Sequence, residues 1–152
     1  MNVPAHVLEL LTVQHEHIDR LLARVRTLVV HRSECVNELA DYVTAHLAVE
    51  QELLYPGLGA RISDAVHAEL LAEHQEIKRV LANLLWLDND DARSTTTLAS
   101  LEALFEGHRV WQDEELFESL AETMSLTALA ELGETVNAGF ERMRGTEVAS
   151  AA

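Results

Sequence analysis

The chain has 152 residues, 48% of them hydrophobic, and its 26 acidic side chains outnumber 11 basic ones to give a formal net charge of −15. This length and composition are typical of one compact domain that buries its own core, and the acidity argues against nucleic acid or an anionic membrane as a partner, because both bind proteins mainly through Lys and Arg. The single cysteine, Cys35, excludes an internal disulfide, and neither a signal-peptide pattern nor a membrane-spanning apolar run is present, so we expect a cytoplasmic protein.

The first predicted element is a helix with a regular apolar face. Its apolar side chains recur every three or four residues, which places them on one side of a helix. His15 lies within this face and should point into the core, whereas His17 should point away from it. The face consists of Leu8, Leu11, His15, Ile18, Leu22, Val25 and Val29.

A second helix is expected to start at Ser33, a residue type that caps helix N-termini, and to stop at Pro56-Gly57. On its inner face a histidine and a carboxylate, His46 and Glu50, lie one turn apart. They interrupt a stripe that is otherwise apolar. The stripe consists of Val36, Leu39, Val43, His46, Glu50 and Leu53.

Ser63 should cap a third helix, which turns His74 inward and ends in a polar loop at 88–97. His74 takes the position that His15 has in the first helix, because the chain contains an internal repeat. Residues 15–23 recur with changes as 74–82, and residues 46–56 recur as 108–118. The repeat predicts two similar helical hairpins.

The second hairpin ends with a fourth helix, expected at about 97–124, which places Phe105 and His108 on its inner face, with Trp111 or Gln112 one turn later. Short connections between neighbouring helices favour an all-α, up-down-up-down four-helix bundle with an additional C-terminal helix. The predicted organisation is the bundle at 1–124, a C-terminal helix at 125–144 that packs on the same domain, and a flexible tail at 145–152.

Four histidines and one carboxylate are therefore predicted on inner helix faces at similar depth. A buried imidazole or carboxylate without a partner costs about 1–3 kcal/mol, so these side chains need a common partner. A metal ion supplies one: imidazole with carboxylate suits iron, zinc, copper or manganese, and bundle interiors hold two-metal sites. One turn after His108 stands Gln112, a neutral and poor bridging ligand, so Asp113 is the next candidate, with Glu114 as a competitor.

These residues resemble the hemerythrin-like family of HHE cation-binding proteins over about residues 6 to 120. The resemblance is carried by a lone first-helix histidine, His-x-x-x-Glu followed by Leu-Tyr-Pro, Glu-His-x-x-Ile on the third helix, and a histidine with Asp five residues later. It implies a non-heme diiron centre with a bridging oxo or hydroxo group. Carried over by position, His15 and His46 bind one iron, His74 and His108 bind the other, and Glu50 and Asp113 bridge the two.

The chain departs from the oxygen-carrying members of that family at Lys78, which stands where they have a further histidine. A protonated ammonium is not a metal ligand, so both irons should keep an open position. This symmetry favours hydrogen peroxide bound across both metals, in a catalase- or peroxidase-like reaction, over dioxygen storage. Reversible binding or sensing of dioxygen, nitric oxide or iron without turnover is the alternative. Tyr42, Lys78 and Gln112 are expected next to the ligands.

Other function classes have less support in the sequence. No Glu precedes a His by three residues, as ferritin-like diiron oxidases require, and the His-Glu-x-x-His pattern of zinc proteases is absent. A metal-free helical interaction domain is a further alternative, and it predicts no bound metal. The choice between iron and zinc or manganese is open at this stage, and we expect a monomer or a weak homo-oligomer.

Overall fold

A computed structural model describes residues 6–28, 30–88 and 90–151, with side chains as far as Gly145. Val29 of the first predicted apolar face and Ala152 of the predicted tail lie outside the described residues, as do residues 1–5 and Asn89. The described chain is helical and contains no strand, which confirms the predicted fold class. None of its helices has the length and apolar character needed to cross a membrane.

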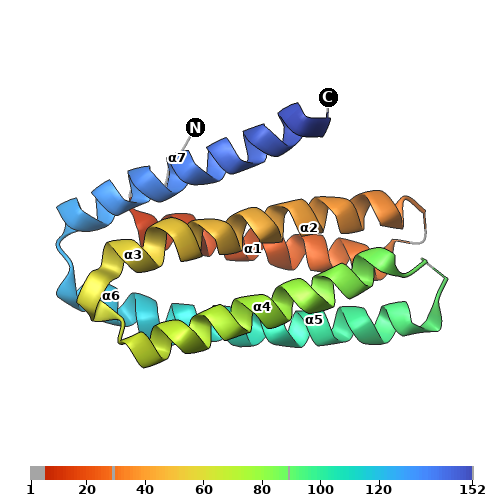
Figure 1. Cartoon of the computed structure of the whole chain (residues 1–152), viewed down its shortest axis with the longest axis horizontal. Coiled ribbons are helices and arrows are strands. Elements are labelled where there is room, and N and C mark those ends of the chain that lie inside the picture. Colours follow the sequence, from red (N-terminus) through yellow and green to blue (C-terminus); the bar gives the residue numbers. More distant parts are fainter. Residues whose placement is uncertain (1–5, 29, 89, 152) are drawn as a thin grey trace.

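Four antiparallel helices form the bundle: α1 (Val7–Thr27), α2 (Arg32–Val49), α4 (Asp64–Trp86) and α5 (Ala92–Trp111). In Figure 1 the α1–α2 and α4–α5 connections lie at one end and the α2–α4 connection at the other, so successive helices run in opposite directions. α1 packs against α2 and α5, and α4 packs against the same two helices. This is the predicted up-down-up-down arrangement.

The second and fourth bundle helices each pass into a π-helical turn at the same point of the repeat. These turns are η1 (Glu50–Leu54), continued by α3 (Tyr55–Leu58) and the 3-10 turn η2 (Gly59–Arg61), and η3 (Gln112–Leu116), continued by α6 (Phe117–Thr123). The N–H of Tyr55 donates to the backbone oxygen of Glu50, five residues earlier, and Phe117 does the same to Gln112. Such turns insert one residue into a helix and are frequent at functional sites.

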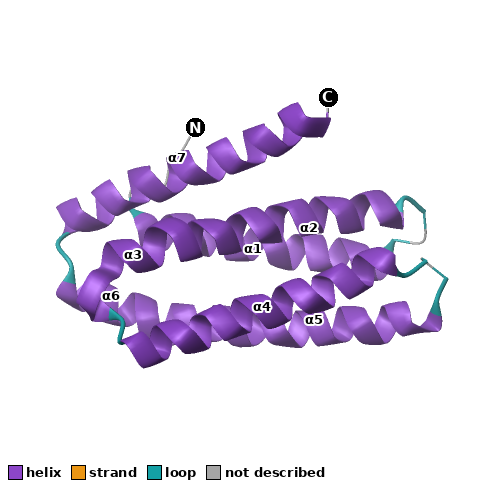
Figure 2. Cartoon of the chain, in the orientation of Figure 1, coloured by secondary structure: helices purple, strands orange, loops and turns teal. Residues whose placement is uncertain are grey.

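A fifth long helix, α7 (Leu126–Ala151), packs against α1 and α2 on the outside of the bundle, as Figure 2 shows. Val136 on its inner face is fully buried. At Gly133 the helix meets the start of α1 so closely that a Cβ would lie 2.8 Å from the backbone nitrogen of Val7. The predicted C-terminal helix is therefore present, but it continues past residue 144 into the segment expected to be a tail.

The two helices of the second hairpin, α4 and α5, each begin directly after a capping residue. Ser63 caps α4 as predicted, because its hydroxyl oxygen accepts from the N–H of Val66 at 3.2 Å. α5 starts at Ala92 and not near residue 97, because Asp91 accepts from the N–H of Arg93 at 2.8 Å and caps the helix there. The polar stretch expected to be a loop thus contains the first turn of a helix.

The ends of α2 differ from the prediction as well. The helix starts at Arg32, one residue before the expected cap Ser33. Pro56 does not end the helical segment: it lies within α3, directly after the π-helical turn η1. The segment turns instead at Gly59, whose φ of +55° is accessible to glycine without strain.

Candidate metal centre

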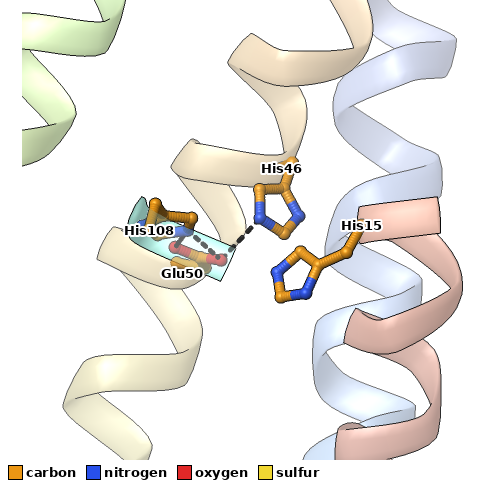
Figure 3. A group of neighbouring side chains, drawn as sticks. All are labelled: His15, His46, Glu50 and His108. Carbon is orange, nitrogen blue, oxygen red and sulfur yellow. Dashed lines mark hydrogen bonds and ion pairs between the residues drawn. The ribbon is translucent and has the colours of Figure 1, made fainter. Parts of the chain in front are cut away.

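Five polar side chains lie together in the middle of an otherwise apolar bundle. Each is at most 1% exposed. One ligand atom from each of four of them lies within 4.8 Å of the others, and Figure 3 shows the three imidazoles of that set turned toward the carboxylate. The four are His15 of α1, His46 of α2, Glu50 of η1 and His108 of α5, and the fifth side chain is His74 of α4. The inward direction predicted for the five from helical periodicity is the one found.

The two oxygens of Glu50 face different imidazoles. Its Oε1 lies 2.6 Å from Nε2 of His46, and its Oε2 lies 3.1 Å from Nε2 of His74. Nε2 of His108 is close to both oxygens, at 3.1 Å from Oε2 and 3.2 Å from Oε1. Glu50 therefore stands between imidazoles that approach it from two sides.

Three of the imidazoles are held at their outer nitrogen by an oxygen atom. Nδ1 of His46 lies 2.8 Å from Oε1 of Gln14, Nδ1 of His108 lies 2.5 Å from Oε1 of Glu73, and Nδ1 of His15 lies 3.2 Å from Oδ1 of Asp113. Amide and carboxylate oxygens accept hydrogen bonds, so Nδ1 is the donor in each pair and Nε2 keeps its lone pair in the neutral ring. Metal-binding histidines are held in this way.

Two of the inner nitrogens have no hydrogen-bond partner among the described residues, although both are buried: Nε2 of His15 and Nε2 of His46. The His46 nitrogen is close to Glu50, but its direction does not make a hydrogen bond. A buried polar atom without a partner costs about 1–3 kcal/mol. A cation between these nitrogens and the carboxylate would satisfy both, so the donor set fits a bound metal.

The charges of the metal-free group also favour a cation. Burial would raise the pKa of Glu50, but His108 and His46 outweigh burial and hold that pKa well below its usual range. Burial, assisted by His46, lowers the pKa of His15 to about 3. Burial also disfavours the charged form of His108, yet Glu50 and Glu73 raise the pKa of that imidazole to about 10. His108 therefore holds a proton that a metal would displace.

The structure differs from the sequence prediction at Asp113, which was expected to be a second bridging ligand. Asp113 is 30% exposed. Its Oδ1 lies 3.2 Å from the outer nitrogen of His15, and its Oδ2 lies 3.7 Å from Nη1 of Arg109. Gln112 is fully buried instead, and its Nε2 donates to the hydroxyl of Tyr55 at 3.1 Å. Gln112, the first residue of η3, keeps the inward face of His108, whereas Asp113 is turned toward the outer side of the ligands. The position equivalent to Glu50 thus holds a neutral amide.

Of the three residues expected next to the ligands, Gln112 lies there and the other two do not. The ring of Tyr42 packs against that of His17, with centroids 4.3 Å apart, and against Phe140 of α7 at 5.1 Å. Lys78 lies one turn after His74 but is partly exposed and outside the buried group.

Three neighbours of the ligands were not found from the sequence: Gln14, Tyr55 and Glu73. The hydroxyl of Tyr55 donates to Oε2 of Glu50 at 3.0 Å and lies 3.4 Å from Nε2 of His74. Burial, together with the charge of Glu50, raises the pKa of Tyr55, so the phenol keeps its proton in the metal-free protein. Gln14 and Glu73 each precede a ligand histidine in the sequence, but periodicity does not show that they reach across to another helix.

One surface groove comes close to the buried group. It has a volume of about 640 Å³. Phe117 is one of its lining residues, and the Phe117 ring is parallel to the His15 imidazole with centroids 6.0 Å apart. The groove lies between α1 and the η3–α6 segment and is lined by His6, Leu8, Glu9, Thr12, Val13, Asp113, Phe117 and Ala121. One layer of side chains thus separates the groove from His15.

Comparisons with known proteins agree with this geometry. A family model described as the hemerythrin HHE cation-binding domain matches residues 6–120. Among solved structures, a hemerythrin HHE cation-binding domain-containing protein from Mycobacterium kansasii has a TM-score of 0.84 and 24% sequence identity, over 95% of this chain and 90% of that one. At this identity the likeness supports the fold. No curated protein matches the chain.

Proposed function

Because the chain belongs to the hemerythrin HHE cation-binding family, we propose that it is a non-heme diiron protein that reacts with small oxygen species, with hydrogen peroxide as its substrate in a catalase- or peroxidase-like reaction. The observation that carries the proposal is the position of Glu50, whose Oε1 faces His46 and whose Oε2 faces His74. A carboxylate in that position can bridge two cations.

In the proposed centre His15 and His46 bind one iron, His74 and His108 bind the other, and Glu50 bridges them. Gln112 stands where the repeat would supply a second bridging carboxylate, and an amide brings no charge. An oxo or hydroxo bridge would provide the further negative charge that two buried cations require. Asp113 acts in this proposal by holding His15 in position, and not as a bridge.

When bound, the iron pair supplies a two-electron couple, which matches both half-reactions of peroxide disproportionation: one peroxide takes up two electrons and two protons to give two waters, and a second releases them as dioxygen. The protein contributes fixed ligand geometry. Gln14, Glu73 and Asp113 orient three imidazoles through their outer nitrogens, and Tyr55 donates to the bridging carboxylate. Phe105 and Phe117 pack beside His15 and limit the entry of water.

Lys78 supports turnover over simple storage of dioxygen. It stands where a third imidazole would saturate the second iron, and it lies outside the buried group. With no third imidazole at that position, the residues that would hold the two irons leave room for an exchangeable ligand. The enclosed position of the ligands restricts that ligand to a small molecule such as peroxide, dioxygen or nitric oxide.

The test is iron loading followed by peroxide consumption. Protein loaded with Fe²⁺ under anaerobic conditions should hold two irons per chain and release one dioxygen for every two peroxides. The matched control is His46→Ala, which removes one ligand and should lose both the iron and the activity. Peroxide loss no faster than with the same amount of free iron would exclude the catalase-like reaction.

The alternative is reversible binding or sensing of dioxygen or nitric oxide, and the same preparation distinguishes it. A visible spectrum that changes on adding the gas and returns when the gas is removed, without peroxide consumption, favours binding. Zinc or manganese in the protein as purified, with no iron, argues against the redox chemistry altogether. A chain that binds no metal would be the helical interaction domain considered from the sequence.

A further inference from the structure

The internal repeat includes the side chains that hold the ligands. Gln14 precedes His15 and reaches His46, and in the second half Glu73 precedes its histidine and reaches His108. The two contacts occupy equivalent positions in the two hairpins, because residues 14 and 73 correspond, as do residues 46 and 108. Both bundle halves therefore fix one imidazole in the same way.

A second type of contact with an outer imidazole nitrogen is made by the second hairpin, and among the described residues the first hairpin does not make its equivalent. Asp113 follows Gln112 and holds the outer nitrogen of His15 at 3.2 Å. The equivalent residue in the first hairpin is Gln51, which follows Glu50, and the equivalent imidazole is His74. Nδ1 of His74 is buried and has no hydrogen-bond partner among the described residues. The repeat thus lacks one of its four outer contacts.

His74 differs from the other ligands in a further respect. One ligand atom from each of the other four side chains falls within 4.8 Å of the rest, and His74 is not part of that set. Its Nε2 is directed to Oε2 of Glu50 and to the hydroxyl of Tyr55. With no acceptor at Nδ1, the tautomer and orientation of this ring are not fixed from outside.

We propose that the two metal positions are unequal: the position of His15 and His46 fills first, and the position of His74 and His108 binds its ion more weakly, because the His74 ring lies outside the compact group and lacks an outer contact. This inference rests on the proposed two-metal function. Loss of an outer contact at a metal-binding histidine lowers metal affinity by about 10–100-fold. The second ion should therefore bind more weakly than the first by at least about tenfold.

The first experiment titrates the metal-free full chain with Co²⁺, a probe that needs no redox reaction, followed by calorimetry and visible absorption. Two steps of unequal affinity are expected. His74→Ala should keep the tight step and lose the weak one, whereas His46→Ala should lose the tight step. Two steps of equal affinity, or a folded His74→Ala variant without the tight step, would overturn the inference, with circular dichroism as the test of folding.

The second experiment supplies the missing contact. Gln51→Asp puts at position 51 the residue that the repeat has at position 113, so it should tighten the weak step by about 10–100-fold and leave the tight step unchanged. The control is Gln75→Asp, which adds the same charge beside His74 at an exposed position. Equal tightening by both variants would mean a general effect of charge and would contradict the specific contact.

These outcomes are separate from those that test the proposed function. If both Co²⁺ steps occur but the iron protein does not consume peroxide, the unequal positions stand and the catalase-like reaction fails. If a single Co²⁺ binds and His74→Ala changes nothing, the second position does not exist, whatever the chemistry of the first.

Discussion

Asp113 contacts the outer nitrogen of His15 at 3.2 Å, while the inner nitrogen of the same ring is buried and has no hydrogen-bond partner in the described part of the chain. This relationship separates two roles that a carboxylate can have near a metal. A bridging ligand must lie on the inner side, among the Nε2 atoms, whereas a carboxylate at Nδ1 fixes the ring and raises its basicity. The partial exposure of Asp113 and its approach to Arg109 agree with the second role.

The first prediction concerns the roles of Asp113 and Gln112. Asp113→Asn should weaken metal binding by about tenfold, because the amide is a poorer acceptor for the His15 N–H, and it should leave the number of bound ions unchanged. Gln112→Glu should tighten the binding of the second ion, because it adds a carboxylate at the position equivalent to Glu50. Calorimetric titration with Co²⁺ measures both. A fall from two ions to one in Asp113→Asn would restore Asp113 as a bridging ligand.

The sequence predicted the inward-facing ligands because helical periodicity alone decides which face a residue occupies. His15, His46, His74 and His108 each interrupt an apolar stripe, and each is buried. The side of a ring that a neighbour contacts depends on how helices are placed against one another, and no local pattern encodes it. That is why Glu73 was missed and why Tyr42, in phase with His46, faces α7 instead.

The π-helical turns were also beyond the reach of periodicity. A regular α-helix through Glu50 would place the following residues on other faces than η1 does. The structure brings Tyr55 back to Glu50 after five residues, one turn of a π-helix. The prediction that Pro56 ends the helix assumed a regular α-helix up to that residue. The chain is π-helical from Glu50 to Leu54, so that assumption does not hold.

The second prediction is proton release on metal binding. Glu50 and Glu73 raise the pKa of His108 to about 10, so near neutral pH the metal-free protein carries a proton that a metal must displace. Binding should release about one proton at pH 7, and affinity should rise with pH toward 10. Calorimetry in two buffers of different ionisation enthalpy measures the release. Equal binding enthalpies in both buffers would contradict it.

The third prediction concerns stability: the shifted pKa values of His108 and Glu50 determine how the free energy of unfolding of the metal-free protein depends on pH. A pKa raised in the folded state gives His108 a stabilising effect that is complete below its unfolded value of about 6.5 and is lost as pH rises toward 10. The pKa of Glu50 is depressed, so its contribution is present above its usual range and is lost on acidification. Thermal unfolding of the metal-free chain should therefore occur at lower temperature at pH 9.5 than at pH 7, and His108→Asn should reduce that difference.

The fourth prediction tests how α7 is attached. At Gly133 a methyl group would lie 2.8 Å from the backbone nitrogen of Val7 and 3.0 Å from the carbonyl carbon of His6. Backbone atoms cannot move aside cheaply, so Gly133→Ala should lower the free energy of unfolding by about 1–3 kcal/mol. Gly107→Ala is the matched control, because Gly107 lies inside α5 and a Cβ there would meet, among the described residues, no atom beyond its own helix turn within 4 Å. It should stabilise the protein by about 0.5–1 kcal/mol. Urea unfolding measures the free energy of unfolding of both variants. Equal changes in the two would contradict the close approach of Gly133 to the backbone of His6 and Val7.

The last prediction concerns the route by which a small molecule reaches the metal. Phe117 and Asp113 both line the larger groove and both contact His15: the Phe117 ring is parallel to the imidazole at 6.0 Å, and Asp113 accepts a hydrogen bond from it at 3.2 Å. Val13 lines this groove and is 48% exposed, so a larger side chain there narrows the groove without entering the core. Val13→Trp should slow nitric oxide binding to the ferrous protein several-fold, as measured by stopped-flow absorption, while Phe117→Leu should accelerate it because a smaller side chain leaves a gap over His15.

Two controls separate this route from a general effect of the substitutions. Leu85→Trp adds the same side chain at an exposed position of α4 that does not line the groove, and it should leave the rate unchanged. A smaller groove of about 110 Å³ reaches Glu73 and Trp111 on the other side of the site, so Trp111→Leu tests the competing route. If Trp111→Leu accelerates binding and Val13→Trp has no effect, reactants enter beside His108 instead of His15. Because nitric oxide binding needs no turnover, this result is independent of whether peroxide is the substrate.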